Sequence, residues 1–110
     1  PLVCAAGAAT LRVLGDPALH AHATRMGDHF QRRVEQLAVP VVREVRGRGL
    51  MRAVELKRPV TPVIKAMQER GLLALPAGGT VIRFLPSLLI DEALIDQAVD
   101  VLAAAVRAAE

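Results

Sequence analysis

The sequence predicts an α+β domain in which helices cover one face of a small, mainly antiparallel sheet of three or four strands. Short β-branched runs come in pairs separated by glycine turns. Longer stretches with an apolar residue at every third or fourth position lie before, between and after these pairs. The 110 residues allow one small core, and a hydrophobic content of 53% is enough to fill it. The expected order is helix, helix, strand, strand, helix, strand, strand, helix.

Two helices are expected at the start of the chain. The first is rich in alanine, runs from Leu2 to Leu14 and ends at Gly15. Asp16 followed by Pro17 is typical of an N-cap and a first helical position, where the missing N–H of proline costs nothing. The second helix then carries its apolar residues on one face: Leu19, Ala23, Met26, Phe30, Val34 and Leu37.

The first pair of strands follows Pro40. A β-branched run over residues 41–45 predicts one strand, and the alternating residues 50–56 predict its antiparallel partner. The glycines of the segment 47–49 turn the chain between the two strands.

The second half repeats this arrangement. Thr61 followed by Pro62 repeats the pattern of an N-cap and a first helical proline, and a third helix that ends at Gly71 is expected after this cap. Residues 72–75 and 80–85 predict two further strands, and Asp91 is expected to cap a last helix. The apolar residues of that helix keep the helical period to its end: Ile95, Ala98, Val99, Leu102 and Val106.

Composition argues against several classes of function. Phe30 and Phe84 are the two aromatic residues, so there is no platform for stacking bases. The net charge of +3 is spread over interspersed charges of both signs, and we expect no nucleic-acid partner. The single cysteine, Cys4, allows no internal disulfide and is expected to be a buried, inert thiol. With no long apolar run and no basic-then-apolar leader, we expect a cytoplasmic protein without a membrane partner.

The histidines and the glycine loops predict no ligand site. His20, His22 and His29 all fall on the second helix without a third ligand between them, so we expect solvated or cap-adjacent side chains and no metal site. The loops 47–49 and 76–79 match no phosphate-binding fingerprint, and turn geometry is the simpler reason for their glycines.

Arg83 is the one candidate binding residue. It interrupts an apolar strand just before Pro86. Its side chain either alternates outward or points into a cleft, where its planar fork would bind a carboxylate through two hydrogen bonds. No catalytic residue can be named, because no activated nucleophile, acid–base pair or metal cluster can be assembled from the other residues.

Several segments in succession resemble the C-terminal part of class III pyridoxal-phosphate aminotransferases. They cover nearly the whole chain in the family's order: residues 1–6, 45–51, 54–56, 69–73, 76–78, 81–90 and 95–98. The central one is Val-Arg-Gly-Arg-Gly-Leu-Met at 45–51. Within the family, the similarity is strongest to enzymes that act on acetylornithine and on carrier-protein-linked lysine intermediates.

This resemblance implies a fold and a site. The fold would be the small domain of fold-type I transferases, with connecting helices over residues 1–38 and the C-terminal small domain over residues 39–110. Arg83 matches the family's C-terminal active-site arginine, which would bind a substrate carboxylate or pair with a glutamate of the large domain. Arg52 and Ala53 replace a small apolar pair of the family, so the middle of that strand is expected to be more exposed or locally different, away from the site.

The resemblance also implies an activity for the complete enzyme. It would move an ω-amino group from an acetylornithine-type substrate to 2-oxoglutarate with pyridoxal phosphate, in arginine or lysine biosynthesis. Neither Lys57 nor Lys65 stands in the family's lysine context, so we expect no cofactor-binding residue here and no activity from this chain alone. Its partners would be the large domain of the same enzyme, a homodimer partner, and the amino-acid and 2-oxoglutarate substrates.

Two other functions are compatible with the residues. One is a stand-alone module that holds a small carboxylate or an amino acid with Arg83. The other is a homo-oligomeric interaction protein, because the alanine-rich first helix could pair with a copy of itself.

Overall fold

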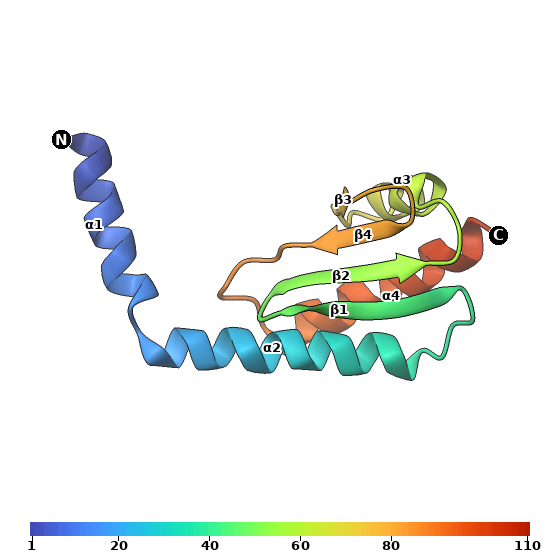
Figure 1. The fold of residues 1–110 in the computed structure, drawn as a ribbon, viewed down its shortest axis with the longest axis horizontal. Helices are drawn as coiled ribbons and strands as arrows, with labels where there is room; N and C mark the ends of the chain where they lie inside the picture. Colours follow the sequence, from blue (N-terminus) through green and yellow to red (C-terminus); the bar gives the residue numbers. More distant parts are fainter.

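The computed structural model describes all residues, 1–110, and confirms the α+β fold (Figure 1). Its elements are α1 (Leu2–Leu14), α2 (Pro17–Gln36), β1 (Val42–Arg48), β2 (Met51–Leu56), α3 (Thr61–Glu69), β3 (Leu75–Pro76), β4 (Val81–Phe84) and α4 (Glu92–Ala108). The order is the one that the sequence predicts.

The four strands form one antiparallel sheet in the order β1-β2-β4-β3. Val45, Val54 and Ile82 lie side by side across the three longer strands. Val54 and Ile82 are fully buried, whereas Ala53 and Arg83, the next residues along their strands, are not. Helices α2 and α4 therefore cover one face of the sheet, and the other face is open and turned toward the viewer in Figure 1.

One hydrophobic core joins the helices to the sheet. It contains 17 buried residues from α2, β2, α3, β4, α4 and the connections between them. Phe30 of α2 packs on Phe84 of β4, with ring centroids 5.0 Å apart. Met26 and Val34 of α2 belong to the same cluster. The boundary between connecting helices (residues 1–38) and a small domain (residues 39–110) stays a prediction. Within this chain, α2 and the sheet share one core.

The helix caps agree with the sequence in two cases of three. The carboxylate of Asp16 accepts a hydrogen bond from the Ala18 backbone N–H at 2.9 Å, and that of Asp91 accepts one from the Leu94 N–H at 2.9 Å. The expected cap at Thr61 is wrong, because Thr61 is already the first residue of α3. The chain enters α3 from Val60, which is 1% exposed and has no side-chain oxygen to offer.

The expected strand over residues 72–75 is wrong for most of its length. The N–H groups of Gly71 and Leu72 still bond to carbonyls of α3, and Gly71 takes a positive φ of 80°. The chain reaches the sheet only at Leu75 and Pro76, which pair with Arg83 and Ile82. Proline cannot donate a ladder hydrogen bond, so Pro76 limits the strand further.

Helix α1 projects from the rest of the chain and has no buried residue (Figure 1). Cys4 is consequently exposed, and the expected buried thiol is wrong. The sequence argument assumed a packing partner for α1, and this chain supplies none. No single helix has the length and apolar character to cross a membrane, and α1 and α2 meet that criterion only jointly, across a bend of 69°.

Close backbone approach explains the glycines at the β1–β2 turn. Gly47 has φ of 140°, and a Cβ built there would lie 2.1 Å from the Met51 carbonyl oxygen. A Cβ at Gly27 of α2 would lie 1.8 Å from the Gly49 carbonyl oxygen. These close approaches explain both glycines. The predicted turn over residues 47–49 is only partly right, because β1 continues through Arg48 and the chain turns at Gly49 and Leu50.

Candidate functional site

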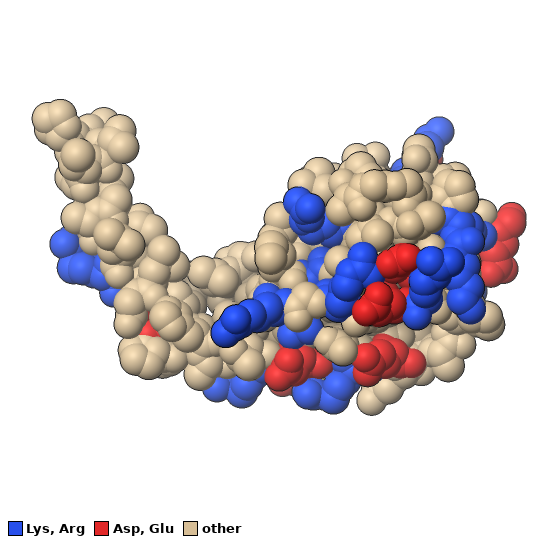
Figure 2. Space-filling model, in the orientation of Figure 1, with Lys and Arg blue, Asp and Glu red and all other residues tan.

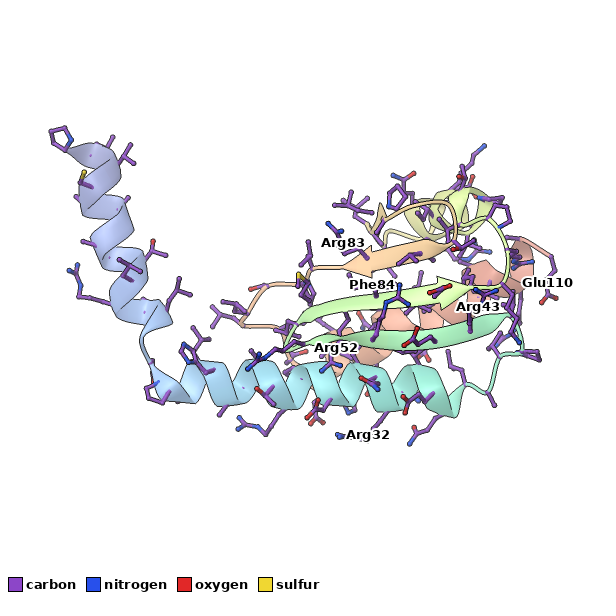
Figure 3. All side chains as sticks on the ribbon, in the orientation of Figure 1. Arg32, Arg43, Arg52, Arg83, Phe84 and Glu110 are labelled. Carbon is purple, nitrogen blue, oxygen red and sulfur yellow. The ribbon has the colours of Figure 1, made fainter.

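Arg83 lies on the open face of the sheet. It sits between Ala53 of β2 and Leu75 of β3 in the strand register, while Ile82 and Phe84 beside it point into the core. Its side chain is exposed, and Figure 3 shows it projecting from β4 on the side away from α2. Alternation along the strand thus places the guanidinium outward, and no cavity of this chain encloses it.

Two other arginines of this face are already paired. The Glu55 carboxylate accepts hydrogen bonds from Arg43 at 3.0 Å and from Arg46 at 2.6 Å, and Glu44 also accepts one from Arg46. The hydrogen bond from Arg46 lowers the pKa of Glu55, and the same bond raises the pKa of Arg46. These groups therefore stay ionised and neutralise one another.

Arg83 differs from this cluster because it makes no hydrogen bond and no ion pair within the chain. Its neighbour across β2 is the small, uncharged Ala53, which leaves space beside the guanidinium. An unpaired, planar guanidinium on a rigid strand can donate two parallel hydrogen bonds to one carboxylate. The site therefore offers carboxylate binding and no nucleophile or general base.

A cavity of about 250 Å³ lies on the other side of β4. It is walled by side chains of α2, the β1–β2 turn, β2, the α3–β3 connection, β4, the β4–α4 connection and α4: Phe30, Leu50, Arg52, Leu72, Leu73, Phe84, Leu85, Pro86, Ile90, Leu94, Ile95 and Ala98. Ten of these twelve residues are hydrophobic, so the cavity suits an apolar group. The sequence analysis missed this cavity, because its wall combines segments that are distant in the chain.

The middle of β2 is expected to be more exposed or locally different, and the first of these alternatives is wrong at Arg52. The whole residue is 5% exposed, and its side chain lies between β2 and α2 (Figure 3). The guanidinium donates to the carbonyl of Gly49 at 2.7 Å, to the side chain of Gln31 at 2.6 Å and to Asp28 at 3.0 Å. Three acceptors compensate its burial, and it lies on the face of the sheet opposite Arg83.

All three histidine rings form hydrogen bonds within the chain, which the sequence does not predict. His20 is cap-adjacent as expected and bonds to the Leu14 carbonyl at the end of α1. His22 and His29 are half-buried, and the expectation that they are solvated is wrong. The Nε2 of His22 bonds to the Ile90 carbonyl at 2.7 Å, and that of His29 to the Asp96 carboxylate at 2.8 Å. The docking of α2 on α4 and on the connection before it makes these bonds. The structure shows no group of three or more His, Cys, Asp or Glu residues placed to hold a metal ion.

The chain was compared with known proteins. The family model for aminotransferase class III matches residues 1–106. The chain belongs to the class III aminotransferase family. The sequence resemblance to this family is therefore confirmed.

The relatives of this class III chain include ornithine aminotransferases. It is 41% identical over 100 residues to ornithine aminotransferase 2 of Staphylococcus aureus and 40% identical over 100 residues to the ornithine aminotransferase of Bacillus subtilis. In both cases the match covers 91% of this chain and 25% of the relative. The chain thus spans about a quarter of the length of the curated relatives it matches.

Solved aminotransferase structures contain the same fold. The acetylornithine aminotransferase of Elizabethkingia anophelis matches 98% of this chain with a TM-score of 0.88 at 31% identity, over 30% of its own length. The lysine aminotransferase of M. tuberculosis matches 92% of this chain with a TM-score of 0.84 at 31% identity, over 24% of its length. The fold class is that of the small domain of fold-type I enzymes, as the resemblance implies.

Class III aminotransferases use pyridoxal phosphate, and the residues of this chain do not form a site for it. Lys57 and Lys65 are both exposed, and neither lines a cavity. The space beside Gly47 is filled by the backbone of Met51, so a phosphate group cannot bind against this glycine. The loop 76–79 leads into β4 and not into a helix N-terminus, where phosphate groups bind.

Proposed function

We propose that this chain supplies the carboxylate-binding small-domain part of a class III aminotransferase. The complete enzyme would transfer an ω-amino group from a substrate of the acetylornithine type to 2-oxoglutarate, in arginine or lysine biosynthesis. The observation that carries the proposal is Arg83, an unpaired guanidinium on the open face, at the position that matches the family's active-site arginine.

The chemistry of the substrates supports this role. Ornithine, acetylornithine and lysine, the substrates in the names of the relatives, each carry an α-carboxylate, and 2-oxoglutarate carries two. An arginine that is already paired would have to break an ion pair to bind a carboxylate. Arg83 has no pair to break, so its binding energy is available to the substrate.

A chimera tests the proposal. In the Bacillus subtilis ornithine aminotransferase, the 100 matched residues are replaced by this chain, and both half-reactions are measured. Loss of a charge-assisted hydrogen-bond pair in Arg83→Ala is expected to lower kcat/KM for 2-oxoglutarate about 10- to 100-fold. Arg83→Lys should recover part of this loss, because it keeps the charge but not the fork.

Arg48→Ala is the matched control, because Arg48 is also an exposed, unpaired arginine on a strand of this sheet. It is expected to leave both half-reactions unchanged. Equal effects of the Arg48 and Arg83 variants, or unchanged kinetics for Arg83→Ala, would remove the proposed role of Arg83.

The chain by itself is proposed to be inactive. Borohydride reduction after addition of pyridoxal phosphate is expected to trap no stoichiometric adduct at Lys57 or Lys65, and such an adduct would contradict the proposal. The alternative of a stand-alone binding module is tested by calorimetry with ornithine, glutamate and 2-oxoglutarate. Saturable binding to the isolated chain would favour that module.

A further inference from the structure

Glu55 is the only acidic residue on the two strands that flank β4. Ala53 of β2 lies directly opposite Arg83, and Glu55 follows two positions further along the same strand. Because Val54 between them is fully buried, Ala53 and Glu55 both project from the open face of the sheet, as Arg83 does. Residues at such diagonal positions lie about 7–8 Å apart, a distance that two long side chains can bridge. The strand register therefore places Glu55 within reach of Arg83.

Glu55 makes no ion pair with Arg83, and both of its carboxylate oxygens are occupied by other arginines. Oε1 accepts a hydrogen bond from Arg43 at 3.0 Å, and Oε2 accepts one from Arg46 at 2.6 Å. Arg46 also donates to Glu44, two positions before it on β1, at 2.9 Å. We call Arg43, Glu44, Arg46 and Glu55 the charge cluster. Figure 2 shows its red and blue side chains side by side over the open face.

The carboxylate of Glu55 is the inner member of the charge cluster. Its side chain is 17% exposed, whereas the side chains of Arg43 and Arg46 are 60% and 43% exposed. The hydrogen bond from Arg46 is the main reason why the pKa of Glu55 is lowered. Glu55 consequently carries its negative charge at neutral pH, and in the absence of Arg46 it would attract another guanidinium within reach.

We propose that Arg46 is a positioning residue that holds Glu55 and so keeps Arg83 unpaired for a substrate carboxylate. The inference rests on the proposed function, in which Arg83 binds the carboxylates of the substrates. Ala53 contributes to the same effect, because the methyl group directly opposite Arg83 offers no acceptor. Without Arg46, one oxygen of Glu55 is released and competes with the substrate for Arg83.

Kinetics of the chimera test this competition. Arg46→Met removes the charge and the hydrogen-bond donors but keeps a long side chain. Competition from an exposed ion pair is expected to raise KM for 2-oxoglutarate about two- to fivefold with kcat unchanged, because saturating substrate displaces Glu55. Arg46→Lys should keep KM closer to its original value, because it leaves a cation beside Glu55. An unchanged KM for Arg46→Met would overturn the proposal.

A double variant separates competition from damage to the fold. Arg46→Met/Glu55→Gln removes the released acid as well, and KM should return to the value of the unaltered chimera. A KM that stays raised in the double variant would show that Arg46 acts through the fold, and the proposal would be wrong.

Arg48→Met is the matched control, because Arg48 is an exposed, unpaired arginine of the same strand. It is expected to leave KM for 2-oxoglutarate unchanged. A rise in KM equal to that of Arg46→Met would contradict the proposal, since loss of a positive charge anywhere on β1 would then explain both effects.

Carbon NMR titration of the Glu55 carboxyl group tests the new pairing in the isolated chain, without reference to activity. In the unaltered chain, Arg83→Ala is expected to change the pKa of Glu55 very little, because other arginines hold both oxygens. In the Arg46→Met background, Arg83→Ala should raise this pKa clearly, because Arg83 has become a partner of the carboxylate. Equal changes of the pKa in the two backgrounds would rule out the competition.

The two proposals fail separately. If Arg83→Ala leaves the kinetics unchanged while the titration shows that Glu55 pairs with Arg83 in Arg46→Met, the proposed function is wrong and the hold on Glu55 remains. If Arg83→Ala impairs the reaction with 2-oxoglutarate and Arg46→Met does not, the proposed function remains and the role of Arg46 is wrong.

Discussion

Arg52 of β2 and Asp28 of α2 form an ion pair at 3.0 Å in which one partner is buried and the other is not. The side chain of Arg52 is 6% exposed and that of Asp28 is 53% exposed. The pair joins the sheet to α2 beside the β1–β2 turn, where the Gly49 carbonyl and Gln31 also bind the guanidinium. Its two ends therefore respond differently to mutation.

Substitution of Asp28 is expected to lower the free energy of unfolding more than substitution of Arg52. Asp28→Ala leaves the buried Arg52 with one acceptor fewer and should lower the free energy of unfolding by about 1.5–3 kcal/mol. Arg52→Met fills the same space without a charge and leaves Asp28 in water, so the change should stay below about 1.5 kcal/mol. Urea denaturation of the three proteins measures both values. A larger loss for Arg52→Met than for Asp28→Ala would contradict this explanation.

Gly47→Ala is expected to destabilise the β1–β2 turn. The alanine would have to adopt a φ of 140°, and its Cβ would lie 2.1 Å from the Met51 carbonyl oxygen. Strain of this kind costs about 1–3 kcal/mol or more. The control is Gly79→Ala, where nothing lies within 4 Å of the added Cβ. Thermal unfolding should show a large decrease in Tm for the first variant and almost none for the second.

Acid should weaken the contact between α2 and α4. Hydrogen bonds from Arg33 and then His29 lower the pKa of Asp96 below its usual value. A carboxylate whose folded-state pKa is depressed contributes stability above its unfolded pKa and loses it as pH falls through the folded pKa. The contribution is therefore fully present at pH 7, begins to decrease near the unfolded-state pKa of about 4 and is lost as pH falls through the lower folded-state pKa.

Asp96→Asn tests this dependence. It should reduce stability more at pH 7 than at pH 3, as measured by urea denaturation at both values. Asp100→Asn is the control, because Asp100 is 71% exposed and lies 3.4 Å from Arg33. An equal decrease in the free energy of unfolding for Asp96→Asn at both pH values would show that the contact does not depend on the charge of Asp96.

A buried core leucine should tolerate truncation far less than an exposed leucine of the sheet. Leu56 is 0% exposed, and Leu56→Ala is expected to lower the free energy of unfolding by about 2–5 kcal/mol. Leu75 is 58% exposed, and Leu75→Ala should change it by less than about 0.5 kcal/mol in the isolated chain. Comparable losses in the two variants would mean that Leu75 is already covered.

Arg83→Ala should leave the stability of the isolated chain unchanged within about 0.5 kcal/mol, because Arg83 is exposed and makes no bond within the chain. Denaturation of this variant therefore serves as the folding control for its kinetic test. A large loss of stability would show that Arg83 supports the fold, and its kinetic effect could then not be attributed to substrate binding.

The elements that the sequence predicts well are those with local signals. The bounds of α1 agree with the expected Leu2 to Leu14, and Asp16 and Asp91 cap their helices through their own side chains. Thr61 shows the limit of such signals, since a threonine before a proline is compatible with both the cap and the first helical position. The strand expected at 72–75 is mostly replaced by the end of α3, because the N–H of Leu72 bonds back to Met67.

The α+β class, the order of the elements, a glycine turn between the first two strands and the family all follow from the sequence, because neighbouring residues carry these signals. The burial of Arg52, the exposure of Cys4 and the exposure of the leucines around β3 and β4 become visible only in the folded chain. Burial depends on which distant segments approach a residue. Arg52 can be buried because α2 and the turn supply its acceptors, and Cys4 is exposed because no segment of this chain packs on α1.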